Sequence, residues 1–363
     1  MQISTMKISV ASLGIAMAMV TASVQAEDGP PRPVISSDGV THVPAFDLPP
    51  SVYMSKESVG ILKMRSMMHG VLPSPSDTIA TARAGNDRQL APIVAMMRAR
   101  YPVDVVEQNI GGVPTRVVTP KGKPFDRKRV LINLHGGAFS VCWEGCSILE
   151  SVPIASVGGF KVVSVNYRMA PEAAHPAGVE DVAAVYRELL KSYKPKNIGI
   201  YGCSAGGALT GQAAAWLPAH GLPQPGAIGI FGAGAVRFGA GDSAYFAGYA
   251  DGGFPPPPRP GDKVGPGLDR GYFANANMAD PIISPALHPE VMAKFPPTLL
   301  ITGTRAPDMS PAIYTNSQLL KAGVRSTLIV GEGQGHCFIY LPQFPESQDA
   351  YQVIANFFRD NLK

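Results

Sequence analysis

Ser204 is the residue whose surroundings suggest chemistry most directly. It lies in Gly202-Cys203-Ser204-Ala205-Gly206, between an apolar run that ends near Tyr201 and a run of small residues. The apolar run predicts a strand and the small-residue run predicts a helix. A sharp turn between them would expose the serine hydroxyl, and glycines on both sides would let the elements pack closely. Because a serine hydroxyl needs a base to become nucleophilic, this pattern predicts a nucleophile only if a partner histidine exists.

A second glycine pair could supply hydrogen-bond donors. Gly136 and Gly137 follow the apolar run that ends at Leu134, in the sequence LHGGAF. Glycine backbone N–H groups can point at a developing oxyanion without a side chain in the way. We therefore expect Gly136, Gly137 and the N–H of Ala205 to form an oxyanion hole.

His336 is the best candidate for the base among the seven histidines. It lies in GEGQGHCF, after the last predicted strand, where a loop can return a histidine to the nucleophile. His135 precedes the donor glycines and more simply shapes their loop. His175 lies in a proline-rich turn, APEAAHPAG, and is expected to be structural.

Strands and helices alternate along most of the chain. Continuous apolar runs such as RVLINLH and KVVSVNY predict strands that are buried on both faces, and amphipathic runs such as VEDVAAVYRELLKSY predict helices between strands. This order indicates an α/β protein with a mostly parallel sheet. Residues 27–106 should form an N-terminal arm and cap helices, and residues 107–363 a catalytic domain. Within that domain, residues 232–280 break the alternation and predict a lid insertion.

Several motifs together resemble those of the bacterial hormone-sensitive-lipase-like branch of the α/β-hydrolase esterases. They are HGGAF, VNYRMAPEAAHPAGVEDV, GCSAGG, YFANANMADPIISPALHPEV with FPPTLLITGTR, and GQGHCF, in the family's order. The resemblance implies an eight-stranded α/β-hydrolase sheet with a helical cap, no cofactor, and a Ser-His-Asp triad with Ser204 and His336. It also implies hydrolysis of short- to medium-chain acyl esters through an acyl-enzyme. Alternatives are an amidase, an acyltransferase or a non-catalytic small-molecule-binding protein on the same fold.

The acid of the triad is where the chain departs from its relatives. Many relatives carry the acid directly after TGTR, where this chain has Ala306. Asp308 lies two residues further on and is our predicted acid, since what matters is a carboxylate within reach of the histidine. Glu332 and Asp280 are alternatives, as is a site without a triad acid, and Asp308 could instead only cap the helix predicted after it.

Two smaller departures and three wall residues complete the predicted site. Ala138 replaces the third glycine of the family's HGGG, and Cys203 replaces an aspartate often found before the serine. Candidate pocket walls are the aromatic residues Phe139, Trp143 and Phe338. Separately, Tyr167, Arg168 and Glu172 should be structural, with an Arg168–Glu172 ion pair holding a crossover loop.

Composition and the N-terminus bound the partners and the compartment. A net charge of +4 without a basic run gives no reason to expect nucleic acid as a partner. The sequence has no compact His/Asp cluster and no pair of CxxC motifs, so we expect no metal site. Residues 1–26 have the basic start, apolar middle and small residues before Glu27 that are typical of a signal peptide. We expect an exported protein, periplasmic or secreted, with no integral membrane segment after processing, and a homodimer is possible.

Export makes the four cysteines relevant, because disulfides persist outside the cytosol. Cys142 and Cys146 are four residues apart, which permits a bridge without requiring one. If bridged, they would stiffen the loop after Gly137. If free, they would be small apolar fillers.

Overall fold

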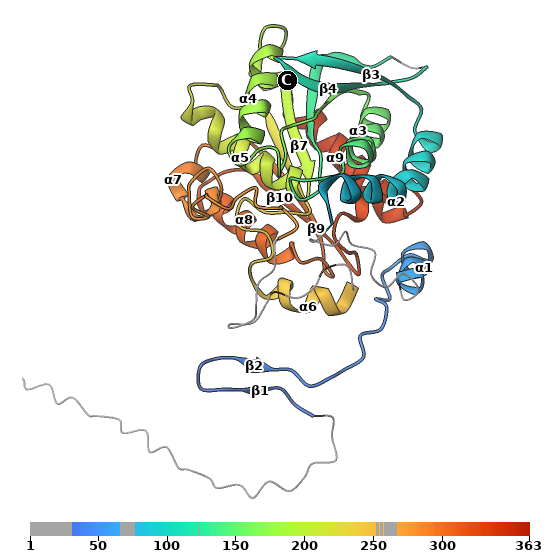
Figure 1. Cartoon of the computed structure of the whole chain (residues 1–363), viewed down its shortest axis with the longest axis vertical. Coiled ribbons are helices and arrows are strands. Elements are labelled where there is room, and N and C mark those ends of the chain that lie inside the picture. Colours follow the sequence, from blue (N-terminus) through green and yellow to red (C-terminus); the bar gives the residue numbers. More distant parts are fainter. Residues whose placement is uncertain (1–30, 66–76, 123, 252–253, 255–256, 258–266) are drawn as a thin grey trace, which may run out of the picture. The chain divides into compact units, whose positions relative to one another are not determined.

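The computed structural model describes residues 31–65, 77–122, 124–251, 254, 257 and 267–363 (Figure 1). The predicted signal peptide lies outside these residues. The chain divides into two compact units, one ending at Leu48 and one spanning Pro49–Lys363. In the first unit, β1 (Val34–Ile35) and β2 (Thr41–His42) form a short antiparallel hairpin.

The predicted eight-stranded sheet is confirmed. Its strand order is β10-β9-β8-β7-β5-β6-β4-β3, and only β4 runs against the others. The strands are β3 (Val103–Ile110), β4 (Val113–Pro120), β5 (Asp126–Leu134), β6 (Phe160–Val165), β7 (Ile198–Cys203), β8 (Ala227–Phe231), β9 (Thr298–Gly303) and β10 (Ser326–Gly331). The parallel strands end at one edge, where loops after β5, β7, β9 and β10 meet.

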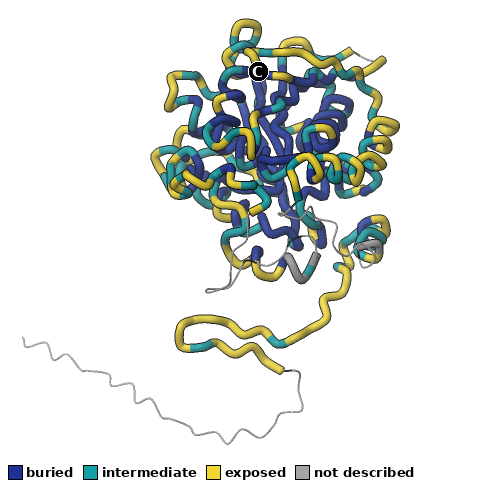
Figure 2. The backbone as a smooth tube through the Cα atoms, in the orientation of Figure 1, coloured by how far each residue is buried: buried dark blue, intermediate teal, exposed yellow. Residues whose placement is uncertain are grey.

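Helices cover both faces of this sheet, and each face has its own core. On β7, Ile198 and Ile200 pack on one face while Tyr201 and Cys203 pack on the other. This alternation explains why the strand sequences are continuously apolar: both sides are buried (Figure 2). The first face is covered by α4 (Ala177–Leu189), α5 (Ala205–Ala219) and α8 (Met309–Lys321), and the second by α3 (Trp143–Gly158) and α9 (Pro345–Asn361).

Further helices lie in the regions predicted to form the cap and lid. They are α1 (Lys56–Arg65), α2 (Ile79–Arg100) and α6 (Asp242–Asp251). The short α7 (Pro289–Met292) lies outside both regions, before β9. Arg83 on α2 donates from Nε to the Ser140 carbonyl at 2.9 Å, so α2 is tied to the loop that carries the predicted oxyanion donors. The sequence did not predict α6, because it lies where the strand–helix alternation fails.

The expected Arg168–Glu172 pair is wrong, although both residues are structural. Arg168 donates to Asp181 at 2.9 Å and to Glu180 at 3.0 Å, both on α4. Glu172 instead pairs with Arg83 at 2.7 Å. Sequence proximity suggested the first pairing, but the crossover loop places α4 beside Arg168 and α2 beside Glu172.

Among the described residues, no helix is both long and apolar enough to span a membrane.

Candidate active site

Ser204 sits on a tight turn between β7 and α5. Its backbone has φ 59° and ψ −122°, a strained conformation for a residue with a side chain. The flanking glycines make the turn possible: a Cβ on Gly206 would lie 1.7 Å from the Leu134 carbonyl oxygen, and one on Gly202 would lie 2.1 Å from it. The Ser204 N–H donates to the Phe231 carbonyl at 2.9 Å, which fixes the turn against β8. The hydroxyl is thereby presented at the strand-end edge of the sheet.

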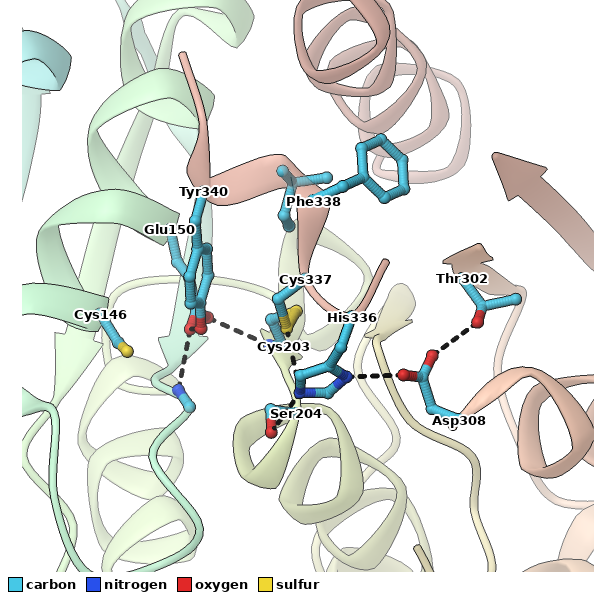
Figure 3. Close-up of a disulfide and its surroundings, with 12 residues drawn as sticks. Cys146, Glu150, Cys203, Ser204, Thr302, Asp308, His336, Cys337, Phe338 and Tyr340 are labelled. Carbon is cyan, nitrogen blue, oxygen red and sulfur yellow. Dashed lines mark hydrogen bonds and ion pairs between the residues drawn. A yellow bond between two sulfur atoms is a disulfide. The ribbon is translucent and has the colours of Figure 1, made fainter. Parts of the chain in front are cut away.

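His336 and Asp308 meet Ser204 in a continuous hydrogen-bonded chain (Figure 3). The Ser204 Oγ lies 2.9 Å from His336 Nε2, and His336 Nδ1 lies 2.6 Å from Asp308 Oδ1. Asp308 is fully buried and the His336 side chain is only 11% exposed. A carboxylate oxygen can only accept, so the proton of the neutral imidazole lies on Nδ1. Nε2 is then free to accept the serine proton.

Asp308 reaches the histidine although it stands two residues beyond the expected position. Ala306 is buried, and its N–H closes a turn onto the Gly303 carbonyl at 3.1 Å. Ser243 on α6 accepts from the Ser310 N–H and donates to the Pro307 carbonyl, holding the start of α8. Asp308 occupies the cap position of α8 without capping it through its side chain, because both carboxylate oxygens are used elsewhere.

The other candidate acids have different roles. Glu332 is exposed, and Asp280 accepts from the nearby Ile282 N–H at 2.8 Å. The second Asp308 oxygen instead accepts from Thr302 Oγ1 at 2.5 Å. Thr302, which the sequence did not single out, therefore orients the carboxylate that orients His336. Its signal was its position at the end of the strand before Asp308.

The predicted oxyanion donors divide into two groups. The N–H groups of Gly137 and Ala205 have no protein acceptor among the described residues, so they are free to bind a ligand oxygen. The Gly136 N–H donates to Glu150 Oε1 at 2.8 Å and is already engaged. Gly136 still lies beside the nucleophile, since a Cβ on it would come 3.3 Å from Ser204 Cβ. Gly137 has φ 112°, a backbone conformation that a side chain would strain.

Glu150 is a buried carboxylate that joins several parts of the site. It accepts from the Gly136 and Cys203 N–H groups, from Asn133 Nδ2 and, at 2.6 Å, from the Tyr340 hydroxyl. Burial raises the pKa of Glu150 to about 7, against these four donors, which favour its charged form. One side chain from α3 thus fixes the oxyanion loop, the serine turn and the turn after His336 (Figure 3).

All four cysteines form disulfides. Cys142 and Cys146 are bridged at the start of α3, which decides the alternative that the sequence left open. Cys203 and Cys337 form a second bridge across 134 residues, which the sequence did not predict. Cys203 precedes Ser204 and Cys337 follows His336, two residues predicted from the sequence to meet. This adjacency could have predicted the bridge.

The three predicted wall residues contact other aromatic, arginine or core side chains, and none of them is one of the aromatic residues that contact the His336 ring. Phe139 stacks on Tyr272 with ring centroids 4.7 Å apart, and Trp143 lies under the Arg116 guanidinium at 4.4 Å. Phe338 packs in the core and points away from His336 (Figure 3). Two residues from the predicted lid contact the histidine ring instead. The ring centroids of Phe254 and Phe238 lie 4.9 and 5.4 Å from that of His336, with interplanar angles of 86° and 73°.

His135 lies in the core beside the loop that carries Gly136 and Gly137. It is fully buried, and burial lowers its pKa to about 4, so it is neutral at physiological pH. Its ring stacks on Tyr167 at 4.5 Å, in agreement with the expected role in shaping the loop. Within the described part of the chain, no group of three or more metal-ligating side chains comes together.

Comparison with known proteins points in one direction. A family model described as the alpha/beta hydrolase fold matches residues 131–340. A versiconal hemiacetal acetate esterase of Dothistroma septosporum is 26% identical over 78% of this chain and 87% of its own length. LipR of Mycobacterium tuberculosis, whose name describes it as a candidate acetyl-hydrolase, is 33% identical over 46% of this chain and 54% of its own. The rabbit (Oryctolagus cuniculus) arylacetamide deacetylase is 36% identical over 32% of this chain and 31% of its own. The chain therefore spans about a third to a half of the length of several curated relatives it matches.

Solved structures agree with the fold. The esterase E25 superposes with a TM-score of 0.73 at 26% identity, covering 89% of this chain and 99% of that one. An esterase of the bacterial hormone-sensitive lipase family, at 24% identity and a TM-score of 0.70, covers 85% of this chain and 97% of its own.

Proposed function

The chain belongs to the α/β-hydrolase fold family, and from that premise we propose that it is a serine carboxylesterase. The observation that carries the proposal is the buried chain of hydrogen bonds from Ser204 through His336 to Asp308. The same arrangement on unrelated folds performs nucleophilic acyl transfer, so geometry rather than sequence position identifies it.

Each group has a defined task in this reaction. Ser204 Oγ attacks the ester carbonyl carbon while His336 Nε2 takes its proton, and Asp308 stabilises the resulting imidazolium. The N–H groups of Gly137 and Ala205 receive the oxyanion. His336 then protonates the departing alcohol, and water, activated by the same histidine, hydrolyses the acyl-serine. No step needs a cofactor.

Short- to medium-chain acyl esters are the proposed substrates. Relatives named as acetyl-hydrolases or acetate esterases support a small acyl group. The Phe238 and Phe254 rings beside His336 offer an apolar surface to the ester. These two residues replace Phe139, Trp143 and Phe338 in our proposal for the pocket wall.

We also propose that the protein is exported. Two disulfides support an oxidising compartment, since such bonds are rare in the cytosol. Expression of the full chain with N-terminal sequencing of the product tests this. Cleavage after Ala26 is expected, and an intact N-terminus in the cytosolic fraction would contradict it.

Hydrolysis of p-nitrophenyl esters tests the enzymatic proposal. Acetate, butyrate and decanoate esters should be turned over by the wild type, with acetate or butyrate preferred, and Ser204→Ala should be inactive. A folded wild type no faster than Ser204→Ala on all three esters would reject the esterase and favour a binding protein.

Amide hydrolysis is the second candidate, because one relative is named an arylacetamide deacetylase and another a kynurenine formamidase. The triad does not choose the leaving group; the pocket does. p-Nitroacetanilide beside p-nitrophenyl acetate separates the two. A kcat/KM for the anilide equal to or above that for the ester would make this enzyme an amidase.

A further inference from the structure

The Cys203–Cys337 disulfide joins the two segments that carry the nucleophile and the base. Cys203 is the last residue of β7 and precedes Ser204, while Cys337 follows His336 (Figure 3). The bridge thus connects residues adjacent to two groups that must stay 2.9 Å apart. Both sulfurs belong to buried residues, 1% and 8% exposed.

One end of the bridge is rigidly held. Cys203 lies in the parallel ladder with β8, and its N–H donates to Glu150 at 3.1 Å. A residue on a central strand whose N–H group is bound to a buried carboxyl group moves little. Cys203 can therefore act as the anchor.

The other end lies in a loop with little backbone support. Among the described residues, the N–H groups of Gly335, His336 and Cys337 donate to no backbone carbonyl. Cys337 also adopts φ 48°, a left-handed conformation that is unfavourable for a residue other than glycine. The disulfide is the covalent restraint on this segment.

The surrounding structure is shaped to accept the bridge beside the imidazole. A Cβ on Gly232 would lie 2.8 Å from Cys337 Sγ, 3.0 Å from Cys203 Sγ and 3.2 Å from His336 Cε1. Any side chain at this position would displace the sulfurs or the ring. Cys337 Sγ itself lies 3.7 Å from His336 Nε2.

We propose that the Cys203–Cys337 disulfide is a positioning element that holds His336 against Ser204 and makes hydrolysis depend on an oxidising environment. The inference rests on the proposed esterase function. An external dithiol would break the S–S bond, place one electron and one proton on each sulfur, and become a disulfide itself. The His336 loop would then be held by hydrogen bonds and packing contacts, without a covalent link to the Ser204 turn. A displacement of about 1 Å can cost 100-fold in rate, so we expect kcat to fall about 10- to 100-fold.

The test compares Cys203→Ala/Cys337→Ala with the matched control Cys142→Ala/Cys146→Ala. Rates of p-nitrophenyl butyrate hydrolysis are expressed per site labelled by a fluorophosphonate in a reaction carried to completion, so that slowly labelled folded molecules are counted and unfolded molecules are excluded. The first variant should lose kcat with KM nearly unchanged, and dithiothreitol should not lower its rate further. The control should still lose activity in dithiothreitol, and reoxidation should restore that activity. A purely structural bridge would lower the melting temperature without lowering kcat per labelled site.

Reduction of the wild type provides an independent measurement if the alanine pair does not fold. Alkylation and mass spectrometry give the fraction of each bridge that is open, and activity should fall with the opening of Cys203–Cys337 alone. Activity that is independent of this fraction, or a kcat for the folded alanine pair within twofold of the wild type, would overturn the inference and leave the esterase proposal intact. An oxidised wild type with neither hydrolysis nor labelling would overturn both.

Discussion

Replacing Asp308 by asparagine removes a negative charge from a site with no solvent to replace it. Asp308 is fully buried, and its two oxygens accept from His336 at 2.6 Å and Thr302 at 2.5 Å. If the amide nitrogen faces His336, the imidazole proton must lie on Nε2. Nε2 then cannot accept the proton of Ser204. With the amide oxygen facing His336, the tautomer is kept but the imidazolium loses its counter-charge.

The expected loss is therefore large. A triad acid replaced by its amide costs about 10⁴ in kcat, which corresponds to about 5 kcal/mol of transition-state stabilisation. The fold should survive, because asparagine has nearly the same shape and can still bond to Thr302. The melting temperature is measured alongside to show this.

Steady-state hydrolysis of p-nitrophenyl butyrate is the assay, with Glu332→Gln as the matched control. Glu332 is exposed and lies four residues before His336, and it was one of the alternative acids suggested by the sequence. Its variant should stay within twofold of the wild type. If Asp308→Asn keeps more than a tenth of the wild-type kcat, or if Glu332→Gln loses more than it does, Asp308 is not the orienting acid.

Three further predictions test the surroundings of the triad, one of them with a control substitution elsewhere. Thr302→Val removes one donor to Asp308 and should lower kcat about fivefold, equivalent to about 1 kcal/mol, in the same ester assay; no change would show that Asp308 does not need this bond. Gly206→Ala places a Cβ 1.7 Å from a backbone oxygen and should lower the free energy of unfolding in urea by about 3 kcal/mol. Gly60→Ala, where the space is open, should raise it by about 0.5 kcal/mol, and equal effects would refute the packing argument. Glu150 has its folded pKa raised from 4.5 to about 7, so its contribution to stability is full below pH 4.5 and is lost as the pH rises through 7. Melting temperatures should therefore decline less between pH 5 and 8 in Glu150→Gln than in the wild type, and parallel curves would contradict the raised pKa.

The sheet and the proximity of Ser204 to His336 could be predicted from the sequence for a common reason. Buried parallel strands leave continuous apolar runs, and the loops after them meet at one edge, which brings Ser204 and His336 together. The proposed acid followed from chemistry rather than from position: Ala306 could not serve, and Asp308 was the nearest carboxylate that could turn back towards the histidine.

The parts that sequence missed depend on contacts between distant segments. Glu150 looks like any helical glutamate until Gly136, Cys203 and Tyr340 converge on it. Phe238 and Phe254 come from a proline- and glycine-rich stretch whose path no periodicity describes. The Cys203–Cys337 bridge spans 134 residues, yet both cysteines adjoin residues predicted to meet, and that reasoning would have paired them.

Covalent labelling with a fluorophosphonate tests whether Ser204 is an activated nucleophile, because the reaction requires an activated serine and no knowledge of the substrate. We expect one adduct per folded molecule, located by mass spectrometry on the peptide that contains Ser204. Ser204→Ala should remain unlabelled, and Asp308→Asn should label far more slowly. A folded wild type that forms no adduct, or forms it at another residue, would contradict the assignment of Ser204 as the nucleophile.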